Sequence, residues 1–252
     1  MNDELVKYSV EGPVATIKIN REKVMNAVSC ETVDHMFNAL KKAENDTQVK
    51  VIVQTASGEA FCTGFDLSTV EFNDDFTLGA VLDDHFHPYI LALRRCKKPI
   101  VSAINGPVAG VGVAIALAGD IILARENAYF FEPFINIGAV PDGGNSYFLP
   151  RLIGTAKANA MVLLAEKVSA IEAEQWGLVW KTVARDEFEG EINRITSKLA
   201  SLPAVALAQS KRVMNASANN SFESQIELER EIQDELGRQP AFKNAISAFV
   251  GR

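Results

Sequence analysis

The sequence predicts an α/β protein in which one α/β domain carries a helical C-terminal subdomain. In the first half, short apolar stretches with strand-like patterning alternate with stretches that have helical spacing. Such alternation is typical of a parallel sheet with right-handed crossover connections. After residue 143 the spacing is mostly helical, and no low-complexity linker separates the two halves.

The first half contains the expected strands and two of the helices. The strands cover 1–10, 14–20, 49–56 and 99–105, and two more lie within 120–133, separated at Glu126 and Asn127. One helix is expected from Cys30 to about Glu44, and a second ends near Arg94 and Arg95.

The second half contains the remaining helices. Helical spacing runs through 156–166, 169–177, 187–202, 204–217 and 221–251, with breaks at Gly177, Pro203 and Pro240. The last of these stretches is charged and amphipathic. An amphipathic terminal helix covers either a subunit interface or the core, and the pattern leaves both possibilities open.

The composition is that of a soluble globular enzyme, with 252 residues, 48% hydrophobic residues and a formal net charge of -7. A chain of this length buries enough apolar surface to fold without a disulfide or a metal. Because the balance is acidic and both signs of charge are scattered, nucleic acid is not expected as a partner.

The cysteines and the apolar segments bear on location. Cys30, Cys62 and Cys96 are widely spaced without a CxxC pair, which favours three reduced thiols in a cytoplasmic protein over a redox or metal site. The N-terminal stretch is charged and has no apolar signal core. The longest apolar window, 108–124, contains glycines and Asp120, so it predicts a buried helix and strand and not a membrane span.

Two glycine-containing loops, 58–68 and 104–120, each follow an expected strand. A glycine-rich turn from strand to helix leaves backbone N–H groups free for an anion, either a phosphate or a developing enolate oxygen. The spacing matches neither GxGxxG nor a GK[ST] phosphate loop. Close packing of helix on strand is the competing explanation for these glycines.

Five motifs, in order, resemble the crotonase (enoyl-CoA hydratase/isomerase) superfamily over nearly the whole chain. They are INREKVMNAV (19–28), FCTGFDL (61–67), INGPVAGVGVAIALAGDIILA (104–124), FFEPFINIGAVPDGGNSYFLPRLIG (130–154) and KVSAIEAEQWGLVWKTV (167–183). The stretch from 143 to 161 is closest to the Δ3,Δ2-enoyl-CoA isomerase branch.

The resemblance implies a spiral of ββα turns over 1–195, and a helical region over 196–252 for trimerisation and pocket closure. It further implies a homotrimer or a dimer of trimers, with an acyl-CoA thioester as substrate. Coenzyme A would then be part of the substrate, and no metal or further cofactor is expected.

The same resemblance implies an oxyanion hole made of two backbone N–H groups, which fall on Thr63 and Val111. The second position is often glycine in the family, so Val111 is a departure, although any residue except proline keeps the N–H. The CoA and thioester path is implied to run past Thr63, Gly64, Phe65, Asp66, Leu67, Gly110 and Phe134. For Asp66, capping the helix that begins near Leu67 is the favoured role.

Hydratases of the family use two glutamates to hold water, and this chain has Ala114 and Phe134 at the matching positions. Asp142 then becomes the candidate acid/base, because some isomerases place a single acid in this loop. A Pro-Asp-Gly-Gly run is also ordinary turn chemistry, and the two roles are compatible. Apolar neighbours would raise the pKa of Asp142; the candidates are Phe134, Ile137, Val140 and Tyr147.

Three other groups of residues carry charge near these motifs. Glu132 lies two residues before Phe134; it could assist proton transfer, but an edge or interface ion pair is favoured. His85 and His87 have the spacing of a strand and lie beside Asp83 and Asp84, yet no third zinc ligand is evident. A basic cluster is expected at a solvated helix end, with contact to CoA phosphates as the alternative: Arg94, Arg95, Lys97 and Lys98.

The favoured function is therefore an enoyl-CoA isomerase of fatty acid metabolism that moves a 3-enoyl double bond to the 2-position through an oxyanion-stabilised dienolate. Three alternatives stay open. They are another single-carboxylate reaction such as aromatic epoxide-CoA isomerisation, weak enoyl-CoA hydratase activity, and a non-catalytic acyl-CoA binder.

Overall fold

The computed structural model describes residues 4–71 and 73–251. Within them the larger sheet has six strands in the order β1-β2-β3-β4-β6-β9. The first two strands pair antiparallel and every later pair is parallel. Their bounds are β1 Val6–Glu11, β2 Val14–Ile19, β3 Val51–Ala56, β4 Ile100–Ile104, β6 Ile121–Arg125 and β9 Lys181–Val183.

A smaller sheet is built from β5 (Val108–Ala109), β7 (Tyr129–Phe131) and β8 (Val168–Ser169). The chain passes from the large sheet to the small one and then into a helix, first as β4-β5-α4 and again as β6-β7-α5. This is the expected repetition of ββα turns. The two strands expected within 120–133 are both present, but they belong to different sheets.

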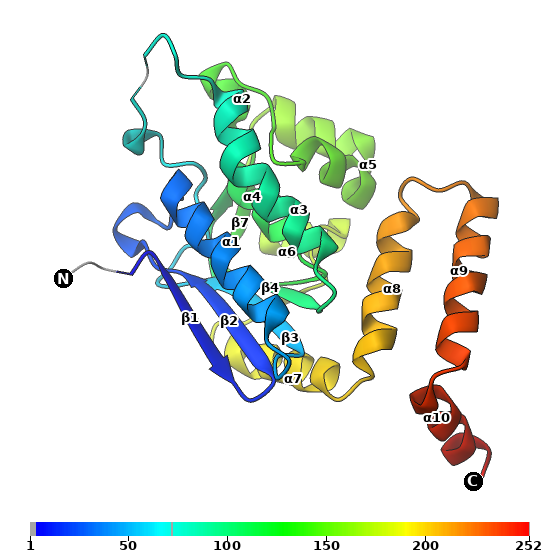
Figure 1. Ribbon diagram of the computed structural model, residues 1–252. Helices are drawn as coiled ribbons and strands as arrows, with labels where there is room; N and C mark the ends of the chain where they lie inside the picture. The colour runs from blue at the N-terminus through cyan, green and yellow to red at the C-terminus, as the bar shows by residue number, and fades with distance from the viewer. Residues whose placement is uncertain (1–3, 72, 252) are drawn as a thin grey trace.

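The helices follow the predicted spacing, and Figure 1 shows their arrangement. Short helical turns lie at Glu22–Val24, Leu67–Thr69 and Pro133–Ile137, and a π-helical segment at Leu82–Phe86. The α-helices are α1 Cys30–Asn45, α2 Leu78–Val81, α3 His87–Arg95, α4 Val111–Leu117, α5 Asn145–Leu163, α6 Ala170–Trp176, α7 Phe188–Ala200, α8 Ala204–Ala216, α9 Phe222–Gly237 and α10 Pro240–Val250.

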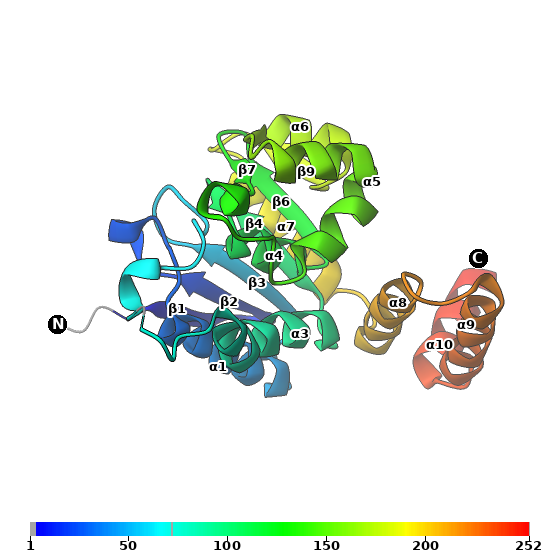
Figure 2. The same ribbon diagram turned by 90° about the horizontal axis from the view of Figure 1, so that it is seen from above.

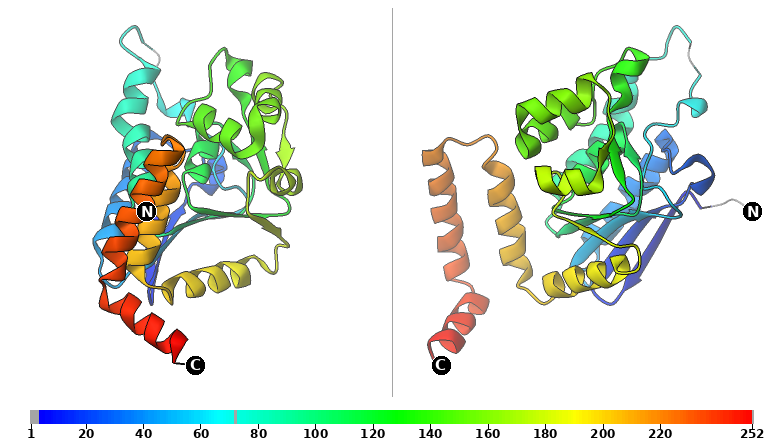
Figure 3. Two further views of the ribbon diagram at one scale, coloured as in Figure 1. Left: turned by 90° about the vertical axis from the view of Figure 1, so that its right-hand side faces the viewer. Right: turned by 180° about the vertical axis from the view of Figure 1, so that it is seen from behind.

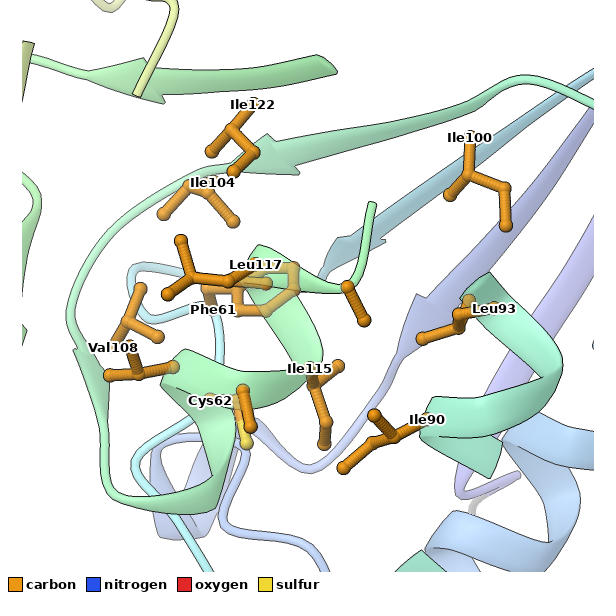
Figure 4. Packing of buried hydrophobic residues seen from close by; sticks show 14 of the residues in the cluster. Phe61, Cys62, Ile90, Leu93, Ile100, Ile104, Val108, Ile115, Leu117 and Ile122 are labelled. Carbon is orange, nitrogen blue, oxygen red and sulfur yellow. The ribbon is translucent and has the colours of Figure 1, made fainter. Parts of the chain in front are cut away.

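Both faces of the central strands are covered. Ile52 of β3 belongs to a large apolar cluster with α1, α3 and α4, while Val51 and Val53 belong to a second cluster with α7. Figure 4 shows part of the large cluster, which includes Leu117 of α4 and Phe61. Because β3 is buried on both faces, its first three residues, 51–53, are all apolar instead of alternating with polar ones. This double-sided packing fixes the sheet on which the two glycine loops stand.

The C-terminal helices project from the rest of the chain (Figures 1, 2 and 3). Helix α8 is attached through Lys211, whose Nζ lies 2.8 Å from Asp120 Oδ2, and through hydrogen bonds between Asn215 and Arg94. Helix α9 packs on α8, and α10 follows α9. The expected boundary between residues 195 and 196 falls inside α7. None of the described helices is long and apolar enough to cross a membrane.

Candidate active site

The two glycine loops lie side by side and are joined by backbone hydrogen bonds. Ala109 N–H donates to the Cys62 carbonyl (2.9 Å), and Phe61 N–H donates to the Pro107 carbonyl (3.1 Å). Gly64 has a φ of +107°, and a β-carbon on it would lie 3.3 Å from the Ala109 carbonyl oxygen. Glycine is therefore needed at 64 both for its conformation and for the close approach of the loops.

Gly110 and Gly112 have different roles, one in forming the strand-to-helix turn and the other in close packing. Gly110 has a φ of +56° and precedes α4, as a strand-to-helix turn requires. At Gly112 a β-carbon would lie 2.4 Å from the Cys62 carbonyl oxygen. This second glycine therefore serves close packing, the competing explanation, and it holds α4 against the loop 61–67.

The backbone N–H groups of Thr63 and Val111 have no hydrogen-bond acceptor among residues 4–71 and 73–251. Val111 is the first residue of α4, where an N–H has no partner within the helix. The Thr63 side chain is engaged elsewhere, because its hydroxyl donates to the Met25 carbonyl (3.1 Å). Two adjoining loops thus each present one free donor.

Asp66 caps the short helix Leu67–Thr69, as predicted. Its Oδ1 accepts from Ser68 N–H (3.2 Å) and its Oδ2 lies 2.8 Å from Arg21 Nη2. Burial opposes ionisation, but the hydrogen bonds from Ser68 and Arg21 hold the pKa of Asp66 below its ordinary value. Phe65 packs edge-on against Phe86, with 5.3 Å between the ring centroids.

Asp142 combines a turn role with a carboxyl that keeps one oxygen without a partner. Its backbone carbonyl accepts from Asn145 N–H (2.9 Å), which forms the turn before α5. Its Oδ1 is buried and has no hydrogen-bond partner within the described chain. Burial raises the pKa of Asp142 to about 6, although His87 on α3 acts in the opposite direction. The turn therefore uses the main chain and leaves the side chain available for chemistry.

The apolar surroundings of Asp142 differ in part from the prediction. Phe134 is buried beside Gly110, but Ile137 and Val140 are 68% and 76% exposed. The prediction was wrong for these two, because Ile137 at the end of the turn Pro133–Ile137 and Val140 in the loop that follows are both exposed. Apolar side chains do pack against the turn at the next residue: a β-carbon at Gly143 would lie within 2.8–3.1 Å of the side chains of Ile90, Val111 and Ala114.

Glu132 corrects a second prediction. It lies at the start of the turn Pro133–Ile137 and not on a strand, and it is completely buried. Its Oε2 accepts from Asn145 Nδ2 at 3.5 Å, and its Oε1 has no partner among the described residues. An edge or interface ion pair is therefore wrong for this side chain.

His85 and His87 lie on helical segments, so the strand-like interpretation of their spacing was wrong. Each ring is paired with its own carboxylate, His85 with Asp34 (2.8 Å) and His87 with Asp83 (3.0 Å). Over residues 4–71 and 73–251, no group of three or more His, Cys, Asp and Glu side chains could hold a metal ion.

The basic cluster at the end of α3 is solvated only in part: Arg95 and Lys97 are exposed, whereas Arg94 and Lys98 bond to neighbouring structure. Lys98 Nζ donates to the carbonyls of Ala43 and Asp46, and Arg94 donates to Asn215. The cluster borders a groove of about 820 Å³ between α3 and α8, and none of the expected site residues lines this groove.

Comparison with known proteins places this geometry in a family. A family model described as enoyl-CoA hydratase/isomerase matches residues 9–252. The chain belongs to this family, the crotonase superfamily. This crotonase is 35% identical over 250 residues to a protein of Rhodobacter capsulatus named "Probable enoyl-CoA hydratase", covering 99% of this chain and 96% of that protein.

Two further similarities extend the comparison. The 1,2-epoxyphenylacetyl-CoA isomerase of Escherichia coli is 32% identical over 254 residues, covering 99% of this chain and 96% of its own. A crystal structure of an enoyl-CoA hydratase from Polaromonas matches with a TM-score of 0.91 and 28% identity, over 98% of this chain and 96% of that one. The protein is thus an acyl-CoA-processing enzyme of the crotonase fold.

The sequence did not indicate that Ile90 and Asn145 lie near Asp142. It also did not indicate that His87 acts on the pKa of Asp142. Asn145 is fully buried, and its Nδ2 donates to the Gly110 carbonyl (3.1 Å). An asparagine just after Gly143 and Gly144 reads as part of a polar turn. Nothing in its local pattern signals that it reaches across to α4.

Proposed function

We propose that this crotonase is an enoyl-CoA isomerase that converts a 3-enoyl-CoA to a 2-enoyl-CoA. One observation carries the proposal: Asp142 offers a partly buried carboxyl, with a pKa of about 6, next to the loop that presents the Val111 N–H. The side chains at the two positions where hydratases of the family carry glutamates are Ala114 and Phe134.

The reaction needs one group that takes and returns a proton. Asp142 removes a proton from C2, the electron pair moves onto the thioester oxygen, and the same proton returns at C4. The Thr63 and Val111 N–H groups stabilise the enolate oxygen, and the loss of one such donor costs on the order of 3 kcal/mol. A pKa near 6 suits both steps, because the carboxylate predominates at neutral pH and its conjugate acid is strong enough to return the proton.

Hydration is disfavoured by the side chains that face the site. A hydratase of the usual kind holds its water between two carboxylates, and neither the methyl group of Ala114 nor the ring of Phe134 can do so. Both side chains are buried and apolar. Weak hydratase activity therefore ranks below double-bond isomerisation.

The loop 61–67 supports the placement of the CoA moiety. Arg21, paired with Asp66 of this loop, borders a groove of about 510 Å³ that is also lined by Lys7 and Lys23. Cationic side chains at this position suit the phosphates of CoA. In this proposal CoA is part of the substrate and the reaction uses no further cofactor.

A trimer, or a dimer of trimers, belongs to the same proposal. Helices α9 and α10 expose several large apolar side chains on the described chain, which a second copy would cover: Phe222, Ile226, Phe242, Ile246, Phe249 and Val250. Exposed large apolar side chains in this number are typical of helices that lie at an interface.

The deciding experiment compares the wild type with Asp142→Asn on a 3-enoyl-CoA. We expect the variant to lose isomerisation by at least 10²-fold while it still binds a saturated acyl-CoA. Asp186→Asn, which changes an exposed aspartate on a surface turn, is the matched control and should keep full activity. Full activity in Asp142→Asn would overturn the assignment.

A second candidate function is isomerisation of an aromatic epoxide thioester, which also needs a single carboxylate. The similarity to 1,2-epoxyphenylacetyl-CoA isomerase favours it. Assays of both thioester classes under the same conditions separate the two reactions. If CoA esters bind but neither class reacts and no C2 proton exchanges with deuterated solvent, the protein is a non-catalytic binder.

A further inference from the structure

A second carboxyl, that of Glu132, lies close enough to Asp142, the proposed acid/base, for the two charges to interact. It is fully buried, and no cation pairs with it within the described residues. Burial, and after it the charge of Asp142, raises the pKa of Glu132 well above its ordinary value. A buried carboxylate without a cationic partner is strongly disfavoured, so the neutral, protonated form is the stable one.

Asn145 connects Glu132 to both working parts of the site. Its side-chain Nδ2 donates to the Gly110 carbonyl (3.1 Å) and to Glu132 Oε2 (3.5 Å). Its backbone N–H donates to the Asp142 carbonyl (2.9 Å). One residue thus links the buried carboxyl, the turn that carries Asp142 and the loop that precedes the Val111 N–H.

This connected cluster is short of hydrogen-bond donors. Six buried side-chain polar atoms in the described chain lack a partner, and three of them are Glu132 Oε1, Asp142 Oδ1 and Asn145 Oδ1. Buried acceptors without partners are costly and uncommon. A neutral Glu132 brings one O–H donor into the cluster, whereas an ionised Glu132 would bring none.

We propose that Glu132 is a positioning residue that keeps its proton throughout the reaction, so that of these two neighbouring carboxyls only Asp142 ionises. When Asp142 takes the C2 proton, the C2–H bond breaks, the Asp142 O–H bond forms and the electron pair moves to the thioester oxygen. The Glu132 O–H bond stays intact. The role of Glu132 in catalysis rests on the proposed function. The electrostatic coupling between Glu132 and Asp142 does not depend on that function.

The surroundings contribute few other charges. Helix α3 brings His87, held by Asp83, toward Asp142, and Arg94 of the same helix lies over the Phe148 ring, 5.6 Å from its centroid. Helix α4 has no titratable side chain, and the next ionisable groups on α5 are Tyr147 and Arg151. Loss of the Glu132 proton would therefore place a second negative charge near Asp142, the charge that already acts on Glu132.

The test titrates the carboxyls of the full-length protein by ¹³C NMR without substrate. We expect the wild-type Asp142 signal to respond twice, once to its own ionisation and again at higher pH when Glu132 ionises. In Glu132→Gln the second response should vanish. Glu166→Gln, which changes an exposed glutamate, is the matched control and should leave both responses in place.

A second variant, Asp142→Asn, tests the same coupling if Glu132→Gln fails to fold. Asp142→Asn removes the neighbouring charge, so Glu132 should titrate lower by on the order of one pH unit. An unchanged Glu132 titration in this variant, or superimposable Asp142 curves in wild type and Glu132→Gln, overturns the proposal.

An activity profile separates this proposal from the proposed function. If Glu132 acts as inferred, C2 proton exchange falls at alkaline pH in the wild type, and Glu132→Gln keeps its activity there. No exchange in the wild type, together with coupled titration curves, refutes the isomerase and leaves the coupling intact. If the wild type exchanges the C2 proton but the titration curves of Asp142 and Glu132 are uncoupled, only the proposed role of Glu132 is refuted.

Discussion

The Asp142 turn rests directly on Ala114. A β-carbon at Gly143 would lie 2.8 Å from Ala114 Cβ, and Gly143 has a φ of +59°. The small residue on α4 and the glycine after Asp142 are therefore complementary. In this chain the room that a larger side chain at 114 would occupy is filled by the turn that presents the proposed acid/base.

Ala114→Glu should consequently fail to create a hydratase. The added carboxyl meets the Asp142 turn in a tightly packed place, and overpacking of this kind costs about 1–3 kcal/mol of unfolding free energy. We expect isomerase activity to fall at least tenfold through displacement of Asp142, with little hydratase gained. Parallel assays of both reactions test this, with Ala114→Ser as the small control. Hydratase activity on top of undiminished isomerisation would show that the turn does not depend on Ala114.

Val111→Pro should isolate the oxyanion donor. Proline is well tolerated at the first position of a helix, where the N–H has no helical partner, and Val111 occupies that position in α4. The variant should fold normally and lose on the order of 10²–10³ in kcat, as expected for the removal of one oxyanion donor. Val111→Ala keeps the N–H and should retain most of the activity. Equal activity in the two variants would remove Val111 from the site.

His87→Gln should move the acidic limb of the pH profile. The Asp142 carboxylate is the active form, so kcat/KM should fall as the pH drops through about 6. His87 holds that pKa down against the effect of burial, and without it the limb should move to higher pH. His85→Gln is the control, because His85 pairs with Asp34. A limb that stays in place in His87→Gln would mean that its charge does not reach Asp142.

Asp142→Asn should make the protein more stable at alkaline pH. Burial raises the folded-state pKa of Asp142 from 3.8 to about 6, so the neutral form favours folding and this contribution is lost as the pH rises through 6. A shift of two units corresponds to about 3 kcal/mol, and partial solvent access reduces it to about 1–3 kcal/mol.

Chemical denaturation at pH 4.5 and pH 8 measures that difference. Asparagine carries no charge at either pH, so the gain over wild type should appear at pH 8 and shrink at pH 4.5. Asp186→Asn should show no such pH-dependent gain. If Asp142→Asn and the wild type have the same free energy of unfolding at both pH 4.5 and pH 8, the ionised Asp142 is well solvated.

Much of the local structure and of the candidate site was predictable from the sequence. The helix from Cys30, the cap at Asp66 and the strands up to Ala124 follow from periodicity and capping chemistry, which act between neighbours in the chain. The motifs pointed to the crotonase family, and the residues at 114 and 134 already argued against a water-holding carboxylate pair. Asp142 could be singled out because, once the two glutamate positions are found to be apolar, it is the carboxyl that remains in the loop before α5.

Only the tertiary structure decided burial and contact across the site. Glu132, expected in an ion pair, lies fully buried, while Ile137 and Val140 turn outward. The approach of Gly143 to Ala114, and of Asn145 to Gly110, joins segments about thirty residues apart. Residue pattern reports which side chains share a face of one element. Which faces meet depends on how distant elements pack, and that packing sets the pKa of Asp142.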